Sequence, residues 1–310
     1  MRIIRDSQFV RPEDRGAAAA IGNFDGVHLG HQAVLDVTRG AAGTAPLGVV
    51  TFEPHPREFF APGAPPFRLM NAEARANRLA KLGVARLYEL PFNAALAGLP
   101  ARDFAAEILH RRLGLTHVVV GPDFQFGKGR DGDAAALQAL GAELGFGVTV
   151  APVREGAEGR ISSTAIRTAL TEGRPRDAAG MLGHWHRMEG PVIRGFQRGR
   201  ELGYPTANMS IDGLHPPKFG VYAVRVDVLD GPYRGSYDGA ASIGVRPMFD
   251  GESPNCETFL FDFSGDLYGA ELSVALVEYL RPEMRFDGLP ALIDQMDADC
   301  LRAREVLARG

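Results

Sequence analysis

The sequence has few of the features that mark secreted or membrane-spanning proteins. Its 310 residues include only two cysteines, Cys256 and Cys300, which are too few for a zinc knuckle or for the disulfide framework of a small secreted protein. No stretch offers the roughly 20 apolar residues that a membrane helix needs. The charged amino terminus also lacks the apolar core of a signal peptide. We therefore expect a cytoplasmic protein with no membrane partner.

An excess of positive charge is also lacking. Lys and Arg number 34 and Asp and Glu number 38, which gives a formal net charge of -4. A surface that neutralises nucleic-acid phosphates carries many more basic than acidic residues, so we expect no nucleic-acid partner and only local phosphate sites. The composition, 45% hydrophobic and 23% charged, is that of an ordinary globular protein. It leaves the oligomeric state open.

The hydrophobic pattern changes character once along the chain, and the length favours two domains. From Ala17 to about Thr149, unbroken apolar runs alternate with amphipathic segments, which is typical of a parallel sheet covered by helices. The expected strands are 17–22, 47–52, 85–90, 117–121 and 147–153, and the expected helices are 31–40, 71–83, 101–114 and 131–145. The first half is therefore predicted to be a doubly wound, Rossmann-like α/β domain over residues 1–184.

Beyond Gly183 the apolar residues alternate with a period of two, as in 220–231, 257–263 and 271–280. This pattern indicates a small antiparallel β-barrel over residues 185–310. A final helix from Asp287 is expected to pack one apolar stripe against the barrel. The stripe consists of Leu289, Leu292, Ile293, Met296, Cys300, Ala303 and Leu307.

Two histidines follow the first apolar run, in the segment from Gly22 to His31. His28 and His31 lie one helical turn apart, so both imidazoles can face one ligand. Ligands of open α/β sheets bind beyond the carboxyl ends of strands, where helix N-termini present free N–H groups to anions. Gly30 would let a ligand approach the backbone. Two histidines alone make an incomplete metal site, so we favour a phosphate site over a metal site, with a surface or capping pair as the alternative.

A second polar cluster, from Arg160 to Arg167, precedes a helical stretch that ends near Thr171. Its hydroxyls belong to Ser162, Ser163 and Thr164. They can simply cap the helix, or they can join Arg167 in binding a polyphosphate. The pattern itself leaves both interpretations open.

The chain contains no G-x-x-x-x-G-K-[ST] loop, which excludes a Walker-type phosphate site. The second half offers instead the segment from Gly195 to Asn208. Its glycines and basic residues can surround phosphates, and the Thr206 hydroxyl and the Asn208 carbonyl are hard oxygen ligands suited to Mg2+. An ordinary barrel turn is the alternative. The candidate phosphate contacts here are Gly195, Arg198, Gly199 and Gly203.

Taken together, these motifs resemble those of the bacterial bifunctional riboflavin kinase and FAD synthetase family. The first half carries GNFDGVHLGH, TFEPHP, a GxDFxFG segment and ISSTxIR in the family's order, and the second half carries PTAN at Pro205 to Asn208, SIGVRP at Ser242 to Pro247 and ExxxxDF at Glu257 to Phe263. The resemblance implies a nucleotidylyltransferase domain in the first half and a riboflavin kinase domain in the second. It also implies riboflavin, FMN and ATP as small-molecule substrates, FAD as product, and Mg2+ as cofactor.

For the first half, the resemblance implies transfer of AMP from ATP to FMN. The attacking phosphate oxygen is already ionised at neutral pH, so this reaction needs phosphate positioning rather than a strong base. By resemblance, His28, His31 and Arg167 are the catalytic residues. The ATP contacts would be Gly22, Phe24, Asp25, Gly30, Ser162, Ser163 and Thr164, and the flavin contacts would be Pro54, Pro56, Phe59, Phe60, Asp123 and Phe126. For the aromatic residues, an ordinary place in the core is the alternative.

For the second half, the resemblance implies transfer of a phosphoryl group to the terminal hydroxyl of riboflavin. This hydroxyl is a very weak acid, so the reaction needs a base, and Glu257 is the candidate. Thr206 and Asn208 would hold Mg2+ with ATP. Gln197 and Ser242 depart from the pattern of many relatives without removing a proposed ligand or base. The alternatives are an enzyme with an inactive kinase half and a flavin-binding regulator without catalysis.

Overall fold

The computed structural model describes residues 1–5, 8–156, 159–195, 203–248 and 251–309. They form two compact units, one made of residues 1–64 and 75–161 and the other of residues 65–74 and 162–310. The boundary between the two units lies between residues 161 and 162, before residue 184, where the hydrophobic pattern of the sequence changes. Residues 65–74 group with the second unit because Leu69 packs in one buried cluster with Ile166 and Leu182.

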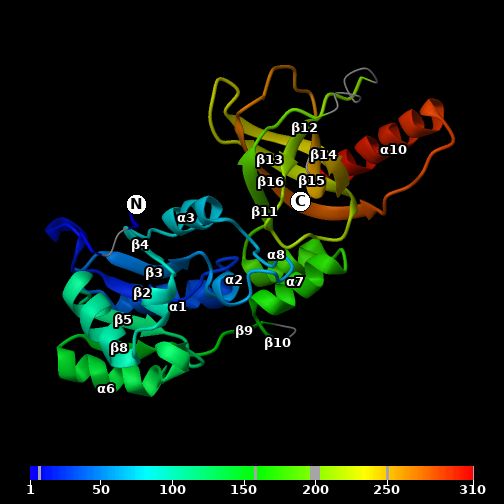
Figure 1. Ribbon diagram of the computed structural model, residues 1–310. Coiled ribbons are helices and arrows are strands. Elements are labelled where there is room, and N and C mark those ends of the chain that lie inside the picture. The colour runs from blue at the N-terminus through cyan, green and yellow to red at the C-terminus, as the bar shows by residue number, and fades with distance from the viewer. Residues whose placement is uncertain (6–7, 157–158, 196–202, 249–250, 310) are drawn as a thin grey trace. The chain divides into compact units, whose positions relative to one another are not determined.

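The first unit is built on a six-stranded parallel sheet in the order β1-β4-β3-β2-β5-β8 (Figure 1). Its strands are β1 (Arg2–Ile4), β2 (Ala18–Ile21), β3 (Leu47–Glu53), β4 (Arg86–Pro91), β5 (His117–Val120) and β8 (Gly147–Val150). The five strands expected from the apolar runs are confirmed. The edge strand β1 was not predicted, because three half-exposed residues between charged ones give no buried-strand signal. Strand order reverses beside β2, so its carboxyl end lies at the topological switch point, where open α/β sheets bind ligands.

Helices connect these strands. They are α1 (Leu29–Ala41), α2 (Pro56–Phe60), α3 (Ala72–Lys81), α4 (Ala94–Ala97), α5 (Ala101–Asp103), η2 (Phe104–Arg112) and α6 (Ala134–Leu144). The shorter elements are η1 (Pro12–Asp14), β6 (Gln125–Phe126), η3 (Lys128–Arg130), β7 (Gly132–Asp133), β9 (Glu155–Gly156) and β10 (Gly159–Arg160). The helix expected over 101–114 is present, but its longer part is π-helical, and the Leu113 N–H donates to the Ile108 carbonyl.

The second unit is built on a six-stranded antiparallel sheet in the order β11-β16-β13-β14-β15-β12 (Figure 1). Its strands are β11 (Arg187–Pro191), β12 (Ala207–Ser210), β13 (Gly220–Val228), β14 (Gly235–Met248), β15 (Gly251–Leu260) and β16 (Glu271–Arg281). The two outer strands approach each other, because the Ile193 N–H, just after β11, donates to the Asn208 carbonyl at 2.8 Å. The sheet therefore curls into a nearly closed barrel, as the period-two pattern predicts.

Among the residues that the structure describes, three helices accompany the barrel, namely α7 (Ser163–Thr171), α8 (Pro175–Leu182) and α10 (Leu289–Leu307). The end of α10 packs as expected, with Ala303 and Leu307 buried against the barrel. The predicted stripe is wrong at its start, where Leu289 is 59% exposed. The helix instead buries Asp299, whose carboxylate accepts hydrogen bonds from the Arg281 guanidinium.

Candidate functional site

The loop after β2 holds an unusual backbone conformation at the switch point. Phe24 (φ 52°) and Val27 (φ 43°) both lie in the left-handed region, beside Gly26 (φ 86°). A β-branched residue is rarely found there. The side chains of Phe24 and Val27 are fully buried, so core packing holds the loop in this shape. Such local strain concentrates at ligand sites.

His28 and His31 meet at the start of α1. Their rings stack with centroids 3.7 Å apart, and the His28 Nδ1 caps the helix by accepting from the His31 N–H at 3.3 Å. A Cβ on Gly30 would lie 3.0 Å from the His28 ring, so this glycine makes room for the imidazole. Burial and the neighbouring His28 hold the pKa of His31 well below its usual value. His31 is therefore neutral at pH 7, and its buried Nδ1 has no hydrogen-bond partner among the described residues.

A buried ion-pair network braces the ends of β2, β3 and β4. Arg75 of α3 donates from Nη2 to Glu53 and to Glu89, each at 3.0 Å, and from Nη1 to the Asn23 carbonyl at 3.5 Å. Arg5 adds a second hydrogen bond to Glu89 at 2.8 Å. Arg75 thus fixes the loop after β2 relative to the neighbouring strand ends. Arg75 is not identifiable as a site residue from the sequence, because a lone arginine on an amphipathic helix resembles any surface cation.

The aromatic residues expected to contact flavin belong to a longer row of rings. Phe59 and Phe60 of α2 each make an edge contact with Phe92, with centroids 5.4 and 5.7 Å apart. Phe92 in turn contacts Phe52, and the row continues through Phe104, Phe126 and Phe124. Phe60 is 69% exposed, which leaves an apolar ring available at the surface. Phe92 was not among the residues predicted for the site. Its position as an aromatic residue directly after β4 was the signal that could have identified it.

The remaining flavin candidates differ in their surroundings. Pro54 follows a cis peptide bond, and Pro56 is the first residue of α2. Asp123 is exposed on the loop after β5. Phe126 is buried in the core cluster of the sheet, where it packs on Phe104 and Phe124. For Phe126 the structure therefore shows the ordinary core position that was the alternative to flavin contact.

The serine-rich cluster begins α7, in the second compact unit. Ser162 is the N-cap, and its hydroxyl accepts from the Ala165 N–H at 3.2 Å. Ser163 and Thr164 occupy the first helical turn. Arg167 donates from Nε to the Phe67 carbonyl at 2.5 Å and lies over the Phe67 ring. The capping interpretation is therefore correct for Ser162.

The kinase candidates come together on one face of the barrel wall. Asn208 of β12 pairs directly with Glu257 of β15, and Glu257 pairs on its other side with Ser242 of β14. Residues directly opposite one another in an antiparallel sheet share a face, so these three side chains form a row. Their neighbour Cys256 is buried in the barrel core on the opposite face. Glu257 is thus placed beside the PTAN segment, as its proposed role as base requires.

The loop before β12 closes around Asn208. The Asn208 Nδ2 lies 3.4 Å from the Thr206 carbonyl and 3.5 Å from the Thr206 hydroxyl. A Cβ on Gly195 would come within 2.6 Å of the same amide, so only glycine fits there. Gly203 lies in a left-handed turn (φ 86°). The candidates Arg198 and Gly199, together with Gln197, lie outside the described residues.

Thr206 and Asn208 carry atoms of the right kind for a hard cation, but the Asn208 Nδ2, not its Oδ1, faces the Thr206 hydroxyl, so the amide would have to turn for both oxygens to bind one ion. A hydroxyl and an amide oxygen are the kinds of ligand that Mg2+ prefers. Among the described residues, no group of three or more His, Cys, Asp and Glu side chains could hold a metal ion. Any magnesium bound at Thr206 and Asn208 would therefore depend on substrate phosphates and water for its remaining ligands. No helix in the described part of the chain is long and apolar enough to cross a membrane.

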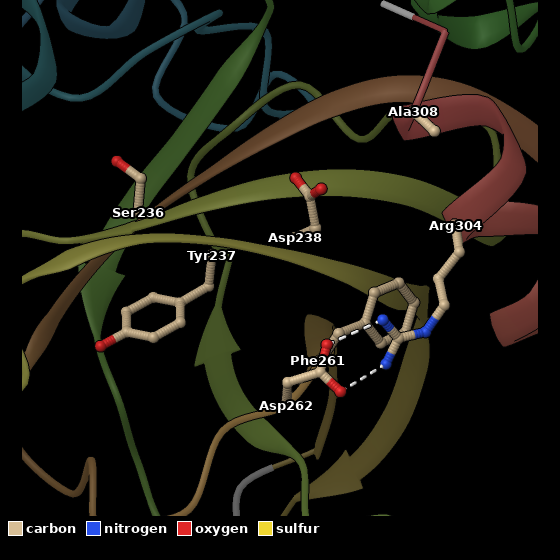
Figure 2. Close-up of a pocket in the computed structure, with 7 residues that line it drawn as sticks. All are labelled: Ser236, Tyr237, Asp238, Phe261, Asp262, Arg304 and Ala308. Atoms are coloured by element: carbon tan, nitrogen blue, oxygen red, sulfur yellow. Dashed lines mark hydrogen bonds and ion pairs between the residues drawn. The ribbon is translucent and has the colours of Figure 1, made fainter.

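A separate hollow of about 500 Å3 lies between the barrel and α10 (Figure 2). Arg304 donates to both carboxylate oxygens of Asp262, at 2.8 and 2.9 Å, and lies over the Phe261 ring. Ser236 and Asp238 line the opposite wall (Figure 2). None of the predicted site residues lines this hollow, and its one arginine is already paired with Asp262.

Comparison with known proteins identifies a family for each half of the chain. Residues 10–165 match the family described as FAD synthetase, and residues 182–307 match the family described as riboflavin kinase. The bifunctional riboflavin kinase/FMN adenylyltransferase of Pseudomonas fluorescens is 43% identical over 99% of this chain and 98% of its own length. The protein of the same name from Escherichia coli K12 is 38% identical over 98% of this chain and 97% of its own length.

Among solved structures, a protein from Streptococcus pneumoniae described as a macrolide-efflux protein has the same fold along its whole length. It superposes with a TM-score of 0.82 at 33% identity, over 96% of both chains. The folds of both units are therefore found in a crystal structure. On the sequence matches, the chain belongs to the bifunctional riboflavin kinase/FMN adenylyltransferase family.

Proposed function

We propose that the two transfers of this family take place at two separate groups of residues in this chain. The activities are phosphorylation of riboflavin to FMN and adenylylation of FMN to FAD, each with ATP as the donor. Adenylylation is assigned to residues 1–184, around His28 and His31, and phosphorylation to residues 185–310, around Glu257. The observation that carries the proposal is the cross-strand pairing of Glu257 with Asn208.

In the adenylyl transfer, a phosphate oxygen of FMN attacks the α-phosphorus of ATP and pyrophosphate leaves. No proton has to be removed from this nucleophile, so the protein acts by positioning the phosphates and stabilising the leaving group. Because His31 is neutral, it contributes an N–H donor rather than a full charge. His28 lies against it and shares the same orientation. The positive charge that neutralises the phosphates is then assigned to the Arg167 guanidinium.

The other contacts of this reaction follow the family pattern. For ATP we propose the residues of the loop after β2 and those that begin α7, because helix N-termini favour anions. For flavin we propose the exposed end of the aromatic row. The ATP contacts are Gly22, Phe24, Asp25, Gly30, Ser162, Ser163 and Thr164, and the flavin contacts are Pro54, Pro56, Phe59, Phe60, Asp123 and Phe126.

In the phosphoryl transfer, the Glu257 carboxylate takes the proton of the terminal riboflavin hydroxyl. The hydroxyl oxygen then forms a bond to the γ-phosphorus of ATP, and ADP leaves. Thr206 and Asn208 would hold Mg2+, which when bound neutralises phosphate charge. Gly195, Arg198, Gly199 and Gly203 are the proposed phosphate contacts. The reaction sites require no membrane, and we propose a cytoplasmic location.

Two single variants test the assignment, each assayed with riboflavin and with FMN as separate substrates. Glu257→Gln keeps the side-chain size but removes the base, so FMN formation should be abolished while FAD formation from supplied FMN continues. His31→Gln should give the reverse pattern. Products are separated by chromatography after incubation with ATP and Mg2+.

The double dissociation between the variants is the result that matters. If Glu257→Gln lost both activities equally while remaining folded, the two-site assignment would be wrong. If the unmodified protein bound riboflavin tightly but formed no FMN, the barrel would be a binding domain rather than a kinase.

A further inference from the structure

Phe67 contacts the Arg167 guanidinium in two ways, although it belongs to none of the motifs. Its backbone carbonyl accepts a hydrogen bond from the Arg167 Nε at 2.5 Å. The central carbon of the guanidinium lies over its ring, 5.3 Å from the centroid. Phe67 is buried, with 6% of its surface exposed, and Arg167 is half-buried. A single residue therefore restrains the guanidinium through its backbone and through its side chain.

This phenylalanine lies in the 65–74 segment, which packs in the second unit although it precedes most of the first. The His215 N–H donates to the Arg68 carbonyl at 2.7 Å. Asn71 donates from Nδ2 to the Glu189 carbonyl of β11 at 2.9 Å. The ring beside the guanidinium is therefore carried by a segment that is hydrogen-bonded to the second half of the chain.

The second half of the chain also holds the backbone of α7. The His215 Nε2 lies 3.2 Å from the Arg167 carbonyl oxygen, and the Lys218 N–H donates to the Leu170 carbonyl at 2.9 Å. Both of these contacts come from the loop between β12 and β13. Because α7 and the 65–74 segment are bound to the same loop, their relative position is fixed within this unit.

An arginine that binds phosphates gains from being held before the ligand arrives. Its long side chain loses rotamer freedom when it binds, and this entropy cost opposes binding. A guanidinium that is already restrained by an aromatic face and a carbonyl has less freedom to lose. The hydrogen bond to Phe67 involves only Nε, and the other four N–H donors of a guanidinium belong to its two Nη groups.

We infer that Phe67 is a positioning residue of the adenylyl transfer, which holds the Arg167 guanidinium in the orientation that binds the phosphates of ATP. The inference rests on the proposed role of Arg167 in that reaction. Phe67 is assigned no contact with ATP or flavin, and it acts only through Arg167.

The test is a double-mutant cycle on the full chain, made of Phe67→Leu, Arg167→Leu and the variant that carries both changes. Phe67→Leu keeps an apolar side chain and the backbone carbonyl but removes the aromatic face. We expect it to lower the kcat of FAD formation from supplied FMN about tenfold, without changing the KM for FMN. The double variant should be no slower than Arg167→Leu alone, because Phe67 then has no guanidinium to hold.

Phe219→Leu is the matched control. Phe219 is also a phenylalanine of the second unit, and its carbonyl accepts from the Tyr279 hydroxyl at 3.2 Å instead of from an arginine. This change should leave the rate of FAD formation unaltered. Phosphorylation of riboflavin is assayed in every variant and should continue in Phe67→Leu, which shows that the second unit is folded.

The outcomes separate the inference from the proposal on which it rests. If Arg167→Leu slows FAD formation and Phe67→Leu does not, only the positioning role fails. If Arg167→Leu changes nothing, the proposed role of Arg167 fails and the inference fails with it. A double variant much slower than Arg167→Leu alone would show a structural effect of Phe67 that does not pass through Arg167, and this result would overturn the inference.

Discussion

Two glycines in the motifs make room for side chains of the protein itself. Gly30 lies under the His28 imidazole, and Gly195 lies against the Asn208 amide. From the sequence, Gly30 is expected to let a ligand approach the backbone. In the structure that space is next to His28. A motif glycine can therefore be required because it lets a neighbouring side chain take up its position.

Gly195→Ala is predicted to impair the kinase reaction specifically. The added Cβ would lie 2.6–2.8 Å from the Asn208 amide atoms, so the amide has to move. Displacing a positioning group by about 1 Å can lower a rate about 100-fold. The rate of FMN formation measures the effect.

Gly180→Ala is the control for this substitution. Gly180 lies in α8, and nothing is within 4 Å of its Cβ position. It should have no effect on either activity. A Gly195→Ala protein that forms FMN at the unmodified rate would show that the Asn208 amide is not needed in its present position.

At the scale of elements, α10 is held to the barrel by two arginine–aspartate pairs of different burial. Arg281 and Asp299 are largely buried, with 16% and 10% of their side chains exposed. Arg304 and Asp262 are mostly exposed, at 47% and 78%. Removing one partner of a buried pair leaves an uncompensated charge, whereas water stabilises the remaining charge of an exposed pair.

Arg281→Met is therefore predicted to lower the free energy of unfolding by about 3 kcal/mol. Arg304→Met should change it little, because the methionine can still cover the Phe261 ring. The only tryptophan of the chain, Trp185, packs against the same cluster as α10, so its fluorescence reports unfolding of this unit. Equal losses in the two variants would contradict the distinction by burial.

At the scale of the whole molecule, buried imidazoles link stability to pH. Burial, with smaller contributions from His184 and His215, lowers the pKa of His186 to about 3. The unfolded chain binds this proton with a pKa near 6.5. Protons therefore favour the unfolded state below pH 6.5, and stability falls as the pH decreases from 6.5 toward 3. Above pH 6.5 the group has no effect.

His186→Gln should consequently reduce the acid sensitivity of the second unit. The contribution of His186 at pH 5 is about 2 kcal/mol, from 1.4 kcal/mol for each pH unit below 6.5. Denaturant unfolding, monitored by Trp185 fluorescence, is measured at pH 7.5 and at pH 5. The quantity compared is the difference between the two free energies of unfolding. If the free energy of unfolding changed as much between pH 7.5 and pH 5 in His186→Gln as in the unmodified protein, buried His186 would not be the cause of the acid sensitivity.

The fold was largely predictable because its core strands are continuous apolar runs. Such runs are buried whatever their partners, as in β3 and β5. The edge strand β1 and the grouping of residues 65–74 with the second unit depend on contacts between distant segments, which local patterns do not encode. The prediction that Leu289 at the start of α10 is buried was wrong, because helical spacing identifies an apolar stripe without showing where its contact with the barrel ends.

The site was predictable where residues are close in sequence or belong to a family motif. His28, His31, Thr206 and Asn208 are examples. Arg75 and Phe92 were missed because their partners lie on other strands or helices. Their roles are set by tertiary contacts, and no spacing rule places them beside the site.

The central claim is that two groups of residues act independently, and mixing two variants that each lack one activity tests it most directly. Glu257→Gln and His31→Gln are each incubated with riboflavin, ATP and Mg2+, alone and together, and the products are separated by chromatography. We predict no FAD from either variant alone, and FAD from the mixture, because FMN made by one protein is adenylylated by the other. Formation of FAD by Glu257→Gln alone, or its absence from the mixture, would contradict the account.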